Sequence, residues 1–138
     1  MTEIPPRAHW KLRVLLLLGI AAMLGLLKIW SPAIILSQDR LSTMNMMSAM
    51  DSACHAYVTE NGSLPPSVDN RALVGALTGA NARRVVYLRL RSAEKNSQNE
   101  AVDAWGTPYR VSYASPTGVD IVSAGSDKVF GTDDDIGN

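Results

Sequence analysis

The sequence is poor in the residues that build many catalytic and metal centres. Its 138 residues include one cysteine, two histidines and one phenylalanine. A single cysteine excludes a disulfide framework within the chain and every metal site that needs several thiolates. Thirteen Lys and Arg residues balance thirteen Asp and Glu residues, so the chain has no net positive charge for general nucleic-acid binding. We therefore expect no nucleic-acid partner.

The motifs of common enzyme classes are also missing. The sequence contains no Gly-x-Ser-x-Gly elbow, P-loop, dinucleotide-binding glycine motif or His-Glu-x-x-His. Cys54 and His55 are adjacent, so on a helix their side chains point about 100° apart and do not form a nucleophile–base pair. Paired carboxylates alone could serve glycoside hydrolysis, but residues 37–138 leave no room for a cleft with an aromatic sugar platform. We expect that the protein is not an enzyme.

The residues that are present divide the chain into two physically different parts. Residues 14–36 hold 18 hydrophobic residues in 23 positions, whereas the other positions are 40% hydrophobic, as in an ordinary soluble domain. Residues 1–36 have a formal charge of +3 and residues 37–138 a charge of −3. The zero net charge is therefore the sum of a basic, apolar part and an acidic, soluble part.

The apolar part has the length of a membrane span. Residues 14–27 are uncharged but too few to cross about 30 Å of hydrocarbon at about 1.5 Å per residue. Extension to residue 36 gives a sufficient length, because the Lys28 ammonium can reach the interface along its aliphatic stem. Pro32 is expected to kink the helix rather than end it, since apolar residues follow. The pattern predicts a transmembrane helix over residues 14–36.

The charges beside this helix predict its orientation. Arg7, Lys11 and Arg13 precede it, so the positive-inside rule places residues 1–13 in the cytoplasm and residues 37–138 outside. A cleaved signal peptide is the alternative interpretation. Pro32 makes the Ser-Pro-Ala sequence a poor cleavage site, and apolar residues continue beyond it. We expect an uncleaved, single-pass anchor with membrane lipid as its first partner.

The helical pattern continues beyond the membrane segment as an amphipathic stalk over residues 37–60. No proline or glycine interrupts it before Asn61-Gly62, which can cap its C-terminus. The methionines on its apolar face are interpreted as flexible core residues rather than as a metal or cofactor site. The apolar residues recur at spacings of three and four: Leu41, Met44, Met47, Met50, Cys54 and Tyr57.

Residues 61–138 are expected to form a small α+β globular domain. Asp69 can cap a short helix that ends at Leu77. Alternation of apolar and polar residues predicts a strand over residues 86–91. Residues 109–113 and 119–123 are rich in strand-forming residues and read as a hairpin with a five-residue connection. The fold class predicted is a long N-terminal helix, transmembrane in its first half, packed by its second half on a small antiparallel sheet.

One segment concentrates potential metal ligands. Four carboxylates lie within nine positions near the C-terminus and repel one another unless a cation lies between them. Oxygen ligands without histidine or cysteine favour Ca²⁺ over transition metals. Asp133 and Asp135 alternate, so they could face one ion together with Asp127, while Asp134 would point elsewhere. A solvated acidic turn is the alternative, and the spacing alone does not choose between the two.

Three motifs follow one another along the soluble part of the chain. They are Ala56-Tyr57 with Asn61-Gly62-Ser63-Leu64-Pro65, Asp103-Ala104-Trp105-Gly106-Thr107-Pro108-Tyr109, and Ser123-Ala124-Gly125-Ser126-Asp127 followed by Gly131-Thr132-Asp133-Asp134-Asp135-Ile136. Together with the apolar helix, they resemble the major pseudopilin of type II secretion systems, a relative of type IV pilins. The resemblance runs from the apolar helix to the C-terminus, and the motifs occur in the family's order.

The resemblance has implications for fold, cofactor, partners and location. It implies a pilin-like fold, with Ca²⁺ bound by Asp127, Asp133 and Asp135, Asp134 being the alternative to Asp133. It also implies assembly with copies of itself, with other pseudopilins or with secretion-system components. The chain would then be anchored in the inner membrane, with its C-terminal domain in the periplasm.

One departure from the family leaves two functions open. Prepilins have a glycine cleavage site before the apolar run and a glutamate within it. Here residues 7–13 precede the run and residues 14–27 contain no acidic residue. The chain is thus expected to be either a structural pseudopilin-like subunit of a type II secretion machine or a membrane-anchored, calcium-binding interaction module that does not polymerise.

Overall fold

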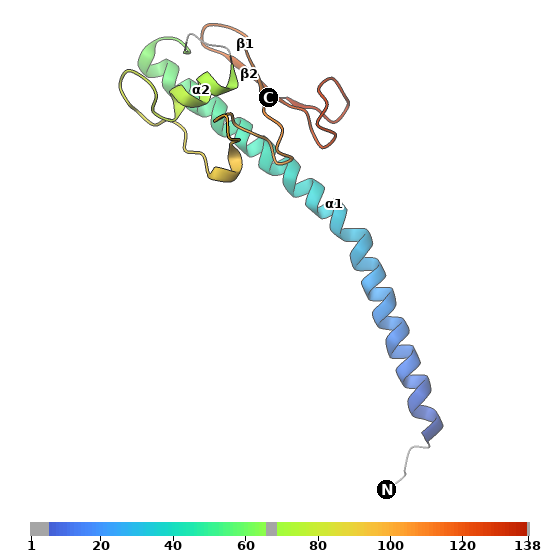
Figure 1. Ribbon diagram of the computed structural model, residues 1–138. Helices are drawn as coiled ribbons and strands as arrows, with labels where there is room; N and C mark the ends of the chain where they lie inside the picture. The colour runs from blue at the N-terminus through green and yellow to red at the C-terminus, as the bar shows by residue number, and fades with distance from the viewer. Residues whose placement is uncertain (1–5, 66–68, 138) are drawn as a thin grey trace. The chain divides into compact units, whose positions relative to one another are not determined.

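The computed structural model describes residues 6–65 and 69–137, and the described chain is built from few elements. The helices are α1 (Pro6–Asn61), α2 (Asn70–Leu77) and the 3₁₀ turn η1 (Ser92–Glu94), and the strands are β1 (Arg110–Tyr113), β2 (Val119–Ser123) and β3 (Ile136–Gly137) (Figure 1). The chain divides into two compact units, Met1–Ser37 and Gln38–Asn138, which are described separately below.

The first unit contains the N-terminal part of α1, a helix of 56 residues without interruption. Leu15–Leu18 and Ile20 are 48–67% exposed within the chain. In the part of the chain that the structure describes, no helix combines the length and the apolar character needed to cross a membrane. The anchor predicted over residues 14–36 falls largely on residues whose side chains lie outside the description, and it stays a prediction.

The second unit has its core on the C-terminal part of α1. Met47, Met50 and Cys54 are almost fully buried, as the apolar stripe predicts, whereas Leu41 and Met44 are 59% and 49% exposed. Burial, and secondarily the charge of nearby Asp51, raises the pKa of the Cys54 thiol to about 12. The stripe therefore contributes to this core from residue 47 onward. Other core side chains come from α2 and the sheet: Leu73, Val74, Leu77, Val119, Ile121 and Ile136.

Helix α2 begins where the sequence predicts and is fixed to the rest of the domain by a buried amide. The Asp69 carboxylate accepts a hydrogen bond of 2.6 Å from the Ala72 N–H, which confirms the predicted cap. The Asn70 side chain donates to the carbonyl oxygens of Ala101 and Tyr109, both at 2.9 Å, and accepts from the Ala101 N–H at 2.8 Å. A buried side-chain amide thus connects α2 with residues 101–109.

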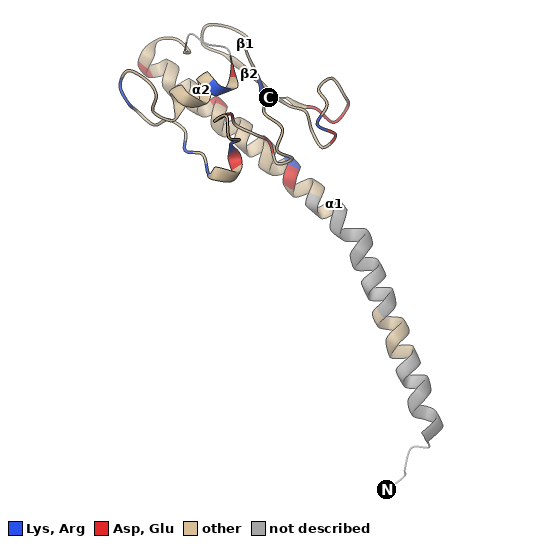
Figure 2. Cartoon of the chain, viewed as in Figure 1, with Lys and Arg blue, Asp and Glu red and all other residues tan. Residues whose placement is uncertain are grey.

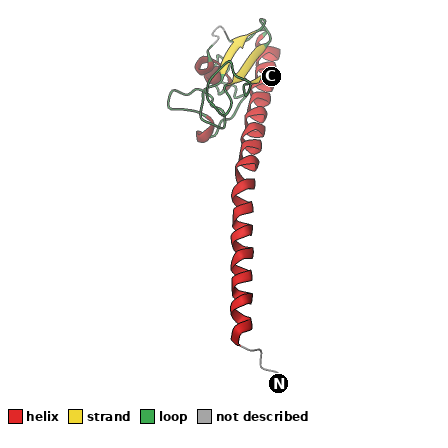
Figure 3. Cartoon of the chain, turned by 90° about the vertical axis from the view of Figure 1, so that its right-hand side faces the viewer, coloured by secondary structure: helices red, strands yellow, loops and turns green. Residues whose placement is uncertain are grey.

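The three strands form one antiparallel sheet in the order β1-β2-β3. Arg110 pairs with Val122 and Tyr113 with Val119, so the predicted hairpin is confirmed, with β1 starting one residue later than expected. Strand β3 was not predicted, because two residues are too short for an alternating pattern to be visible. Figure 3 shows the two longer strands beside the C-terminal part of α1.

The strand predicted over residues 86–91 is wrong. The segment has no regular secondary structure and pairs with no strand in the described chain. Instead, the N–H groups of Tyr87 and Leu88 both donate to the carbonyl of Leu77, at 2.8 and 3.0 Å. The alternation indicated a strand, but the carbonyl of Leu77 at the end of α2 accepts two of the hydrogen bonds that a neighbouring strand would have accepted.

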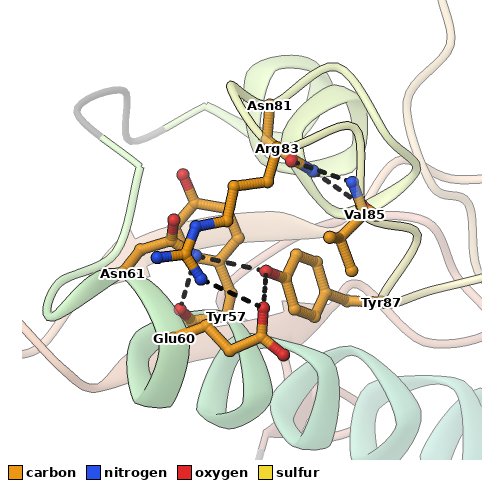
Figure 4. Close-up of polar contacts among 7 residues, drawn as sticks. All are labelled: Tyr57, Glu60, Asn61, Asn81, Arg83, Val85 and Tyr87. Atoms are coloured by element: carbon orange, nitrogen blue, oxygen red, sulfur yellow. Dashed lines mark hydrogen bonds and ion pairs between the residues drawn. The ribbon is translucent and has the colours of Figure 1, made fainter.

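The same segment also closes the C-terminal end of α1 (Figure 4). The Tyr87 hydroxyl donates to the Glu60 carboxylate at 2.8 Å and accepts from the Asn61 amide at 3.2 Å. The Asn61 amide also donates to the Tyr57 carbonyl, one of the carbonyls that lack partners at a helix end. The Tyr57 and Tyr87 rings meet edge to face with centroids 5.3 Å apart. Polar contacts therefore hold the helix end against residues 81–87.

Candidate calcium site in the C-terminal loop

The acidic residues predicted to bind a metal lie in the loop between β2 and β3, which we call the acidic loop (residues 124–135). Its charged side chains are four aspartates and Lys128. Figure 2 marks the positions of these residues in red and blue along the loop, near the C-terminal end of the chain. The loop belongs to the second unit of the chain, and both of its ends are fixed by strands of the sheet.

The backbone of the acidic loop turns sharply and closes on itself at Gly125. Gly125, Lys128 and Gly131 have φ values of +68°, +63° and +95°. A Cβ atom at Gly125 would overlap the carbonyl oxygen of Asp134 and lie 2.6 Å from its carboxylate Oδ2. Only glycine permits this contact, so the beginning and the end of the loop meet at Gly125.

Asp134 points into the loop, which corrects the expectation that it points elsewhere. Its Oδ2 accepts from the Ser126 hydroxyl at 3.0 Å and from the Asp127 N–H at 3.1 Å. Its Oδ1 accepts from the Thr132 hydroxyl at 2.6 Å. These hydrogen bonds lower the pKa of Asp134 to about 2, and the bond from Thr132 has the largest effect. The alternation argument assumed an extended backbone, whereas residues 132–135 form a turn.

Asp135 is the aspartate with an unsatisfied oxygen. Its Oδ2 accepts from the Gly131 N–H at 2.7 Å. Its Oδ1 is buried and, among the described residues, finds no hydrogen-bond donor. A carboxylate oxygen removed from water without a partner is costly, so native structures rarely leave one without a reason. Asp135 thus supplies an oxygen that is free to accept a further partner.

The other two predicted ligands lie at the surface. Asp127 and Asp133 are exposed, and Asp127 Oδ1 accepts from the Val129 N–H at 2.8 Å. Within residues 6–65 and 69–137, no three Asp, Glu, His or Cys side chains gather closely enough to hold a metal ion together. The structure therefore does not bring Asp127, Asp133 and Asp135 together as a triad of carboxylates.

The first residues of the acidic loop are held in place by Asp103, a buried aspartate outside the loop. The sequence did not predict this role for Asp103. Asp103 is 4% exposed, and its Oδ1 accepts from the N–H groups of Trp105 at 3.0 Å and Thr107 at 2.8 Å. Its Oδ2 accepts from the Ser123 hydroxyl at 2.6 Å, and the Ser123 oxygen accepts from the Gly125 N–H at 3.1 Å. An aspartate two residues before a turn N–H is a recognisable turn motif, but its bond to Ser123 could not be read from the sequence.

The acidic loop is also held from its middle. The guanidinium carbon of Arg110, the first residue of β1, lies 3.9 Å from the centroid of the Phe130 ring. Such a cation–π contact contributes about 0.5–1 kcal/mol at an exposed site. The loop is thus attached to the sheet by a buried hydrogen-bonded link at its start and by a surface contact near its middle.

The arrangement described above, in which the C-terminal part of α1 packs on a small antiparallel sheet, is an α+β fold. The sequence matches the family described as "Type II secretion system (T2SS), protein G" over residues 37–138. The chain therefore belongs to this family of structural subunits of the type II secretion machinery, whose place is the cell envelope.

The fold also has a similar solved structure. The crystal structure of the major pseudopilin from the type 2 secretion system of enterohaemorrhagic Escherichia coli is 25% identical to the chain, with a TM-score of 0.47. The match covers 74% of this chain and 87% of that one. No curated protein matches the sequence.

Proposed function

We propose that the chain is a membrane-anchored pseudopilin whose external domain is stabilised by Ca²⁺ and assembles with other pseudopilins or secretion-system components. Membership of the protein G family supports the structural role. The apolar run over residues 14–36 and the basic residues before it support a single-pass anchor in the inner membrane, with the folded domain in the periplasm. In this function the protein acts by assembly, not by catalysing a reaction.

The observation that carries the calcium proposal is the buried Oδ1 of Asp135 without a hydrogen-bond partner. Ca²⁺ takes six to eight oxygen ligands, which include backbone carbonyls and water as well as carboxylates. A calcium site therefore does not need three carboxylates in mutual contact. The acidic loop offers only oxygen donors, a tight backbone and an excess of negative charge, and this donor set fits a hard divalent cation.

Asp127, Asp133 and Asp135 remain the side chains proposed to hold the ion. Asp135 has the strongest support, because its free oxygen is buried. Asp127 and Asp133 are exposed, and each has oxygens that face solvent. Asp134 is an alternative to Asp133, because its carboxylate already lies against Gly125 and accepts bonds from both arms of the loop. Bound Ca²⁺ would neutralise part of the repulsion among these four carboxylates.

Thermal unfolding of the full chain in detergent, with and without Ca²⁺, tests the metal assignment. At a hundredfold excess of Ca²⁺ over its dissociation constant we expect about 2.7 kcal/mol of stabilisation. The double variant Asp127→Ala with Asp135→Ala should lose this gain. Asp120→Ala, which removes an exposed aspartate of β2 outside the loop, is the matched control and should keep it. No gain at millimolar Ca²⁺ in the unaltered chain would refute calcium binding.

Membrane fractionation tests the anchor independently of calcium. The full chain should stay in the inner-membrane fraction after a high-salt wash and leave it only in detergent, because residues 14–36 would lie in hydrocarbon. Added protease should digest the C-terminal domain in spheroplasts but not in inverted vesicles. Release of the chain by salt alone would contradict the anchor.

The second candidate function, an interaction module that does not polymerise, is favoured by one feature of the sequence. Residues 14–27 contain no acidic residue, so a contact in lipid between a carboxylate and a neighbouring subunit is not available there. Electron microscopy of cells that overproduce the chain separates the two functions. Filaments that antibodies against this chain decorate would support the pseudopilin subunit, whereas membrane-bound protein without filaments would support the module.

A further inference from the structure

The hydrogen-bonded link from Asp103 through Ser123 to Gly125 has no counterpart elsewhere in the acidic loop. We propose that Asp103 and Ser123 are positioning residues for the calcium site: they bind no metal themselves but set the geometry of the loop that does. This inference rests on the calcium binding proposed above. It adds two residues from outside the predicted ligand set to the determinants of affinity.

The hydrogen bond between Ser123 and Asp103 is buried and involves a charged acceptor. Ser123 is fully buried and Asp103 is 4% exposed, so water does not compete for their polar atoms. The Ser123 hydroxyl can point in only one useful direction, toward Asp103 Oδ2 at 2.6 Å. A hydrogen bond to a carboxylate is roughly twice as strong as a neutral one. Asp103 therefore fixes the rotation of the Ser123 hydroxyl.

The Ser123 hydroxyl in turn fixes the start of the acidic loop. With its proton donated to Asp103, the Ser123 oxygen presents lone pairs, one of which accepts from the Gly125 N–H at 3.1 Å. Gly125 has a φ of +68°, a conformation that other residues rarely adopt. The bond holds this peptide in place at the point where the chain leaves the sheet.

A close contact at Gly125 connects the start of the loop with the segment that carries the proposed ligands. The backbone and carboxylate of Asp134 lie directly against Gly125, so a shift of Gly125 moves Asp134. The next residue is Asp135, whose buried Oδ1 is the proposed metal-binding oxygen. A change at Ser123 is thus transmitted to the ligands through two close contacts. Partners that orient metal ligands change metal affinity by about 10- to 100-fold when they are removed.

Isothermal titration of the full chain in detergent with CaCl₂ tests the proposal at a temperature where every variant is folded. Ser123→Ala should weaken Ca²⁺ binding by about tenfold. Thr43→Val is the matched control, because it also removes one buried hydroxyl. The Thr43 hydroxyl, on α1, accepts a hydrogen bond of 3.2 Å from the N–H of Ala104 in the turn that follows Asp103. The Thr43→Val substitution should lower the melting temperature but leave the dissociation constant within about twofold.

A second variant covers the case in which Ser123→Ala does not fold. Asp103→Asn keeps an oxygen for the Trp105 and Thr107 N–H groups but turns an amino group toward Ser123, which then cannot donate its proton. It should also weaken Ca²⁺ binding. Unchanged affinity in the folded variants, or an equal loss in Thr43→Val, would overturn the positioning role while leaving calcium binding intact. Absence of binding in the unaltered chain would overturn both proposals.

Discussion

The two aspartate-centred turns of the domain differ in how completely the chain satisfies them. Both oxygens of Asp103 accept hydrogen bonds, and the turn over residues 103–107 is complete without any added partner. In the acidic loop, Asp135 leaves Oδ1 buried without a donor among the described residues. The first turn is satisfied by the chain itself, whereas the second leaves one buried carboxylate oxygen without a hydrogen-bond donor among the described residues.

This difference has an energetic meaning. A buried carboxylate whose donors all come from the chain keeps its hydrogen bonds whether or not a metal ion is present. A buried oxygen without a donor lowers stability until something positive binds it, so stability then depends on the concentration of that ligand. Substitutions in the two turns should therefore respond differently to calcium, and the following variants test this from the largest expected effect to the smallest.

Asp103→Ala should have the largest effect. It removes the acceptor of the buried Ser123 hydroxyl and of the partly buried Trp105 and Thr107 N–H groups. We expect a loss of about 4 kcal/mol in the free energy of unfolding in calcium-free buffer. Urea denaturation followed by tryptophan fluorescence measures it, with Asp120→Ala as the surface control. A loss below about 1 kcal/mol would show that the turn is not the complete unit described above.

Gly125→Ala should cost about 3 kcal/mol and Gly131→Ala only about 1 kcal/mol. Both residues have positive φ, so both alanines incur backbone strain. Only at Gly125 would the new Cβ meet Asp134, because no atom lies within 4 Å of a Cβ at Gly131. The difference between the two variants, measured in the same denaturation experiment, isolates the closure of the acidic loop at Gly125. Equal costs would show that the loop opens easily at that point.

Asp135→Ala should show most clearly that only the acidic loop responds to calcium. Without calcium it should cost less than about 1 kcal/mol, since it loses one hydrogen bond, from Gly131 N–H, and removes an unsatisfied oxygen. With saturating Ca²⁺ it should cost the additional stabilisation that the ion provides to the unaltered chain. Melting temperatures in EDTA and in Ca²⁺ give both values. A large cost in EDTA would mean that Asp135, like Asp103, is satisfied by the chain alone.

Glu94→Gln should have the smallest effect and supplies a reference for a surface charge. Glu94 accepts from the side chain and the N–H of Arg91, and these contacts lower its pKa. A carboxylate with a lowered pKa stabilises the fold above its unfolded pKa and loses this contribution as the pH falls. The substitution should cost about 0.5 kcal/mol at pH 7. The difference should shrink as the pH falls below about 4.3, the ordinary pKa of a glutamate, and vanish only below the lowered pKa of the folded state. A difference that grows in acid would reverse the assignment.

The sequence predicted the elements of the fold where local chemistry decides them. The Asp69 cap of α2 and the β1–β2 hairpin depend on neighbouring residues, and both occur as expected. The segment over residues 86–91 was misassigned because its pairing depends on the carbonyl of Leu77, which only the tertiary fold brings near. Strand β3 was not predicted because two residues are too few to show an alternation of apolar and polar side chains.

The candidate site was predictable in composition but not in geometry. Four aspartates in a short loop were compatible with a bound cation or with a solvated acidic turn, and the spacing alone did not choose between them. Which of them faces inward depends on the turn over residues 132–135, because this turn does not follow the alternation assumed for an extended chain. The contribution of Asp103 was missed because its partner Ser123 lies 20 residues away.

Cys54 gives this protein an internal reporter of its own unfolding. The thiol is 1% exposed in the core, and its pKa of about 12 leaves almost no thiolate at neutral pH. Because the thiolate is the reacting species, a thiol reagent modifies Cys54 only when the core opens. The rate of modification therefore measures the opening of the domain without an added label. Because the native thiol does not react in the folded protein, a single cysteine introduced into the acidic loop can be labelled selectively.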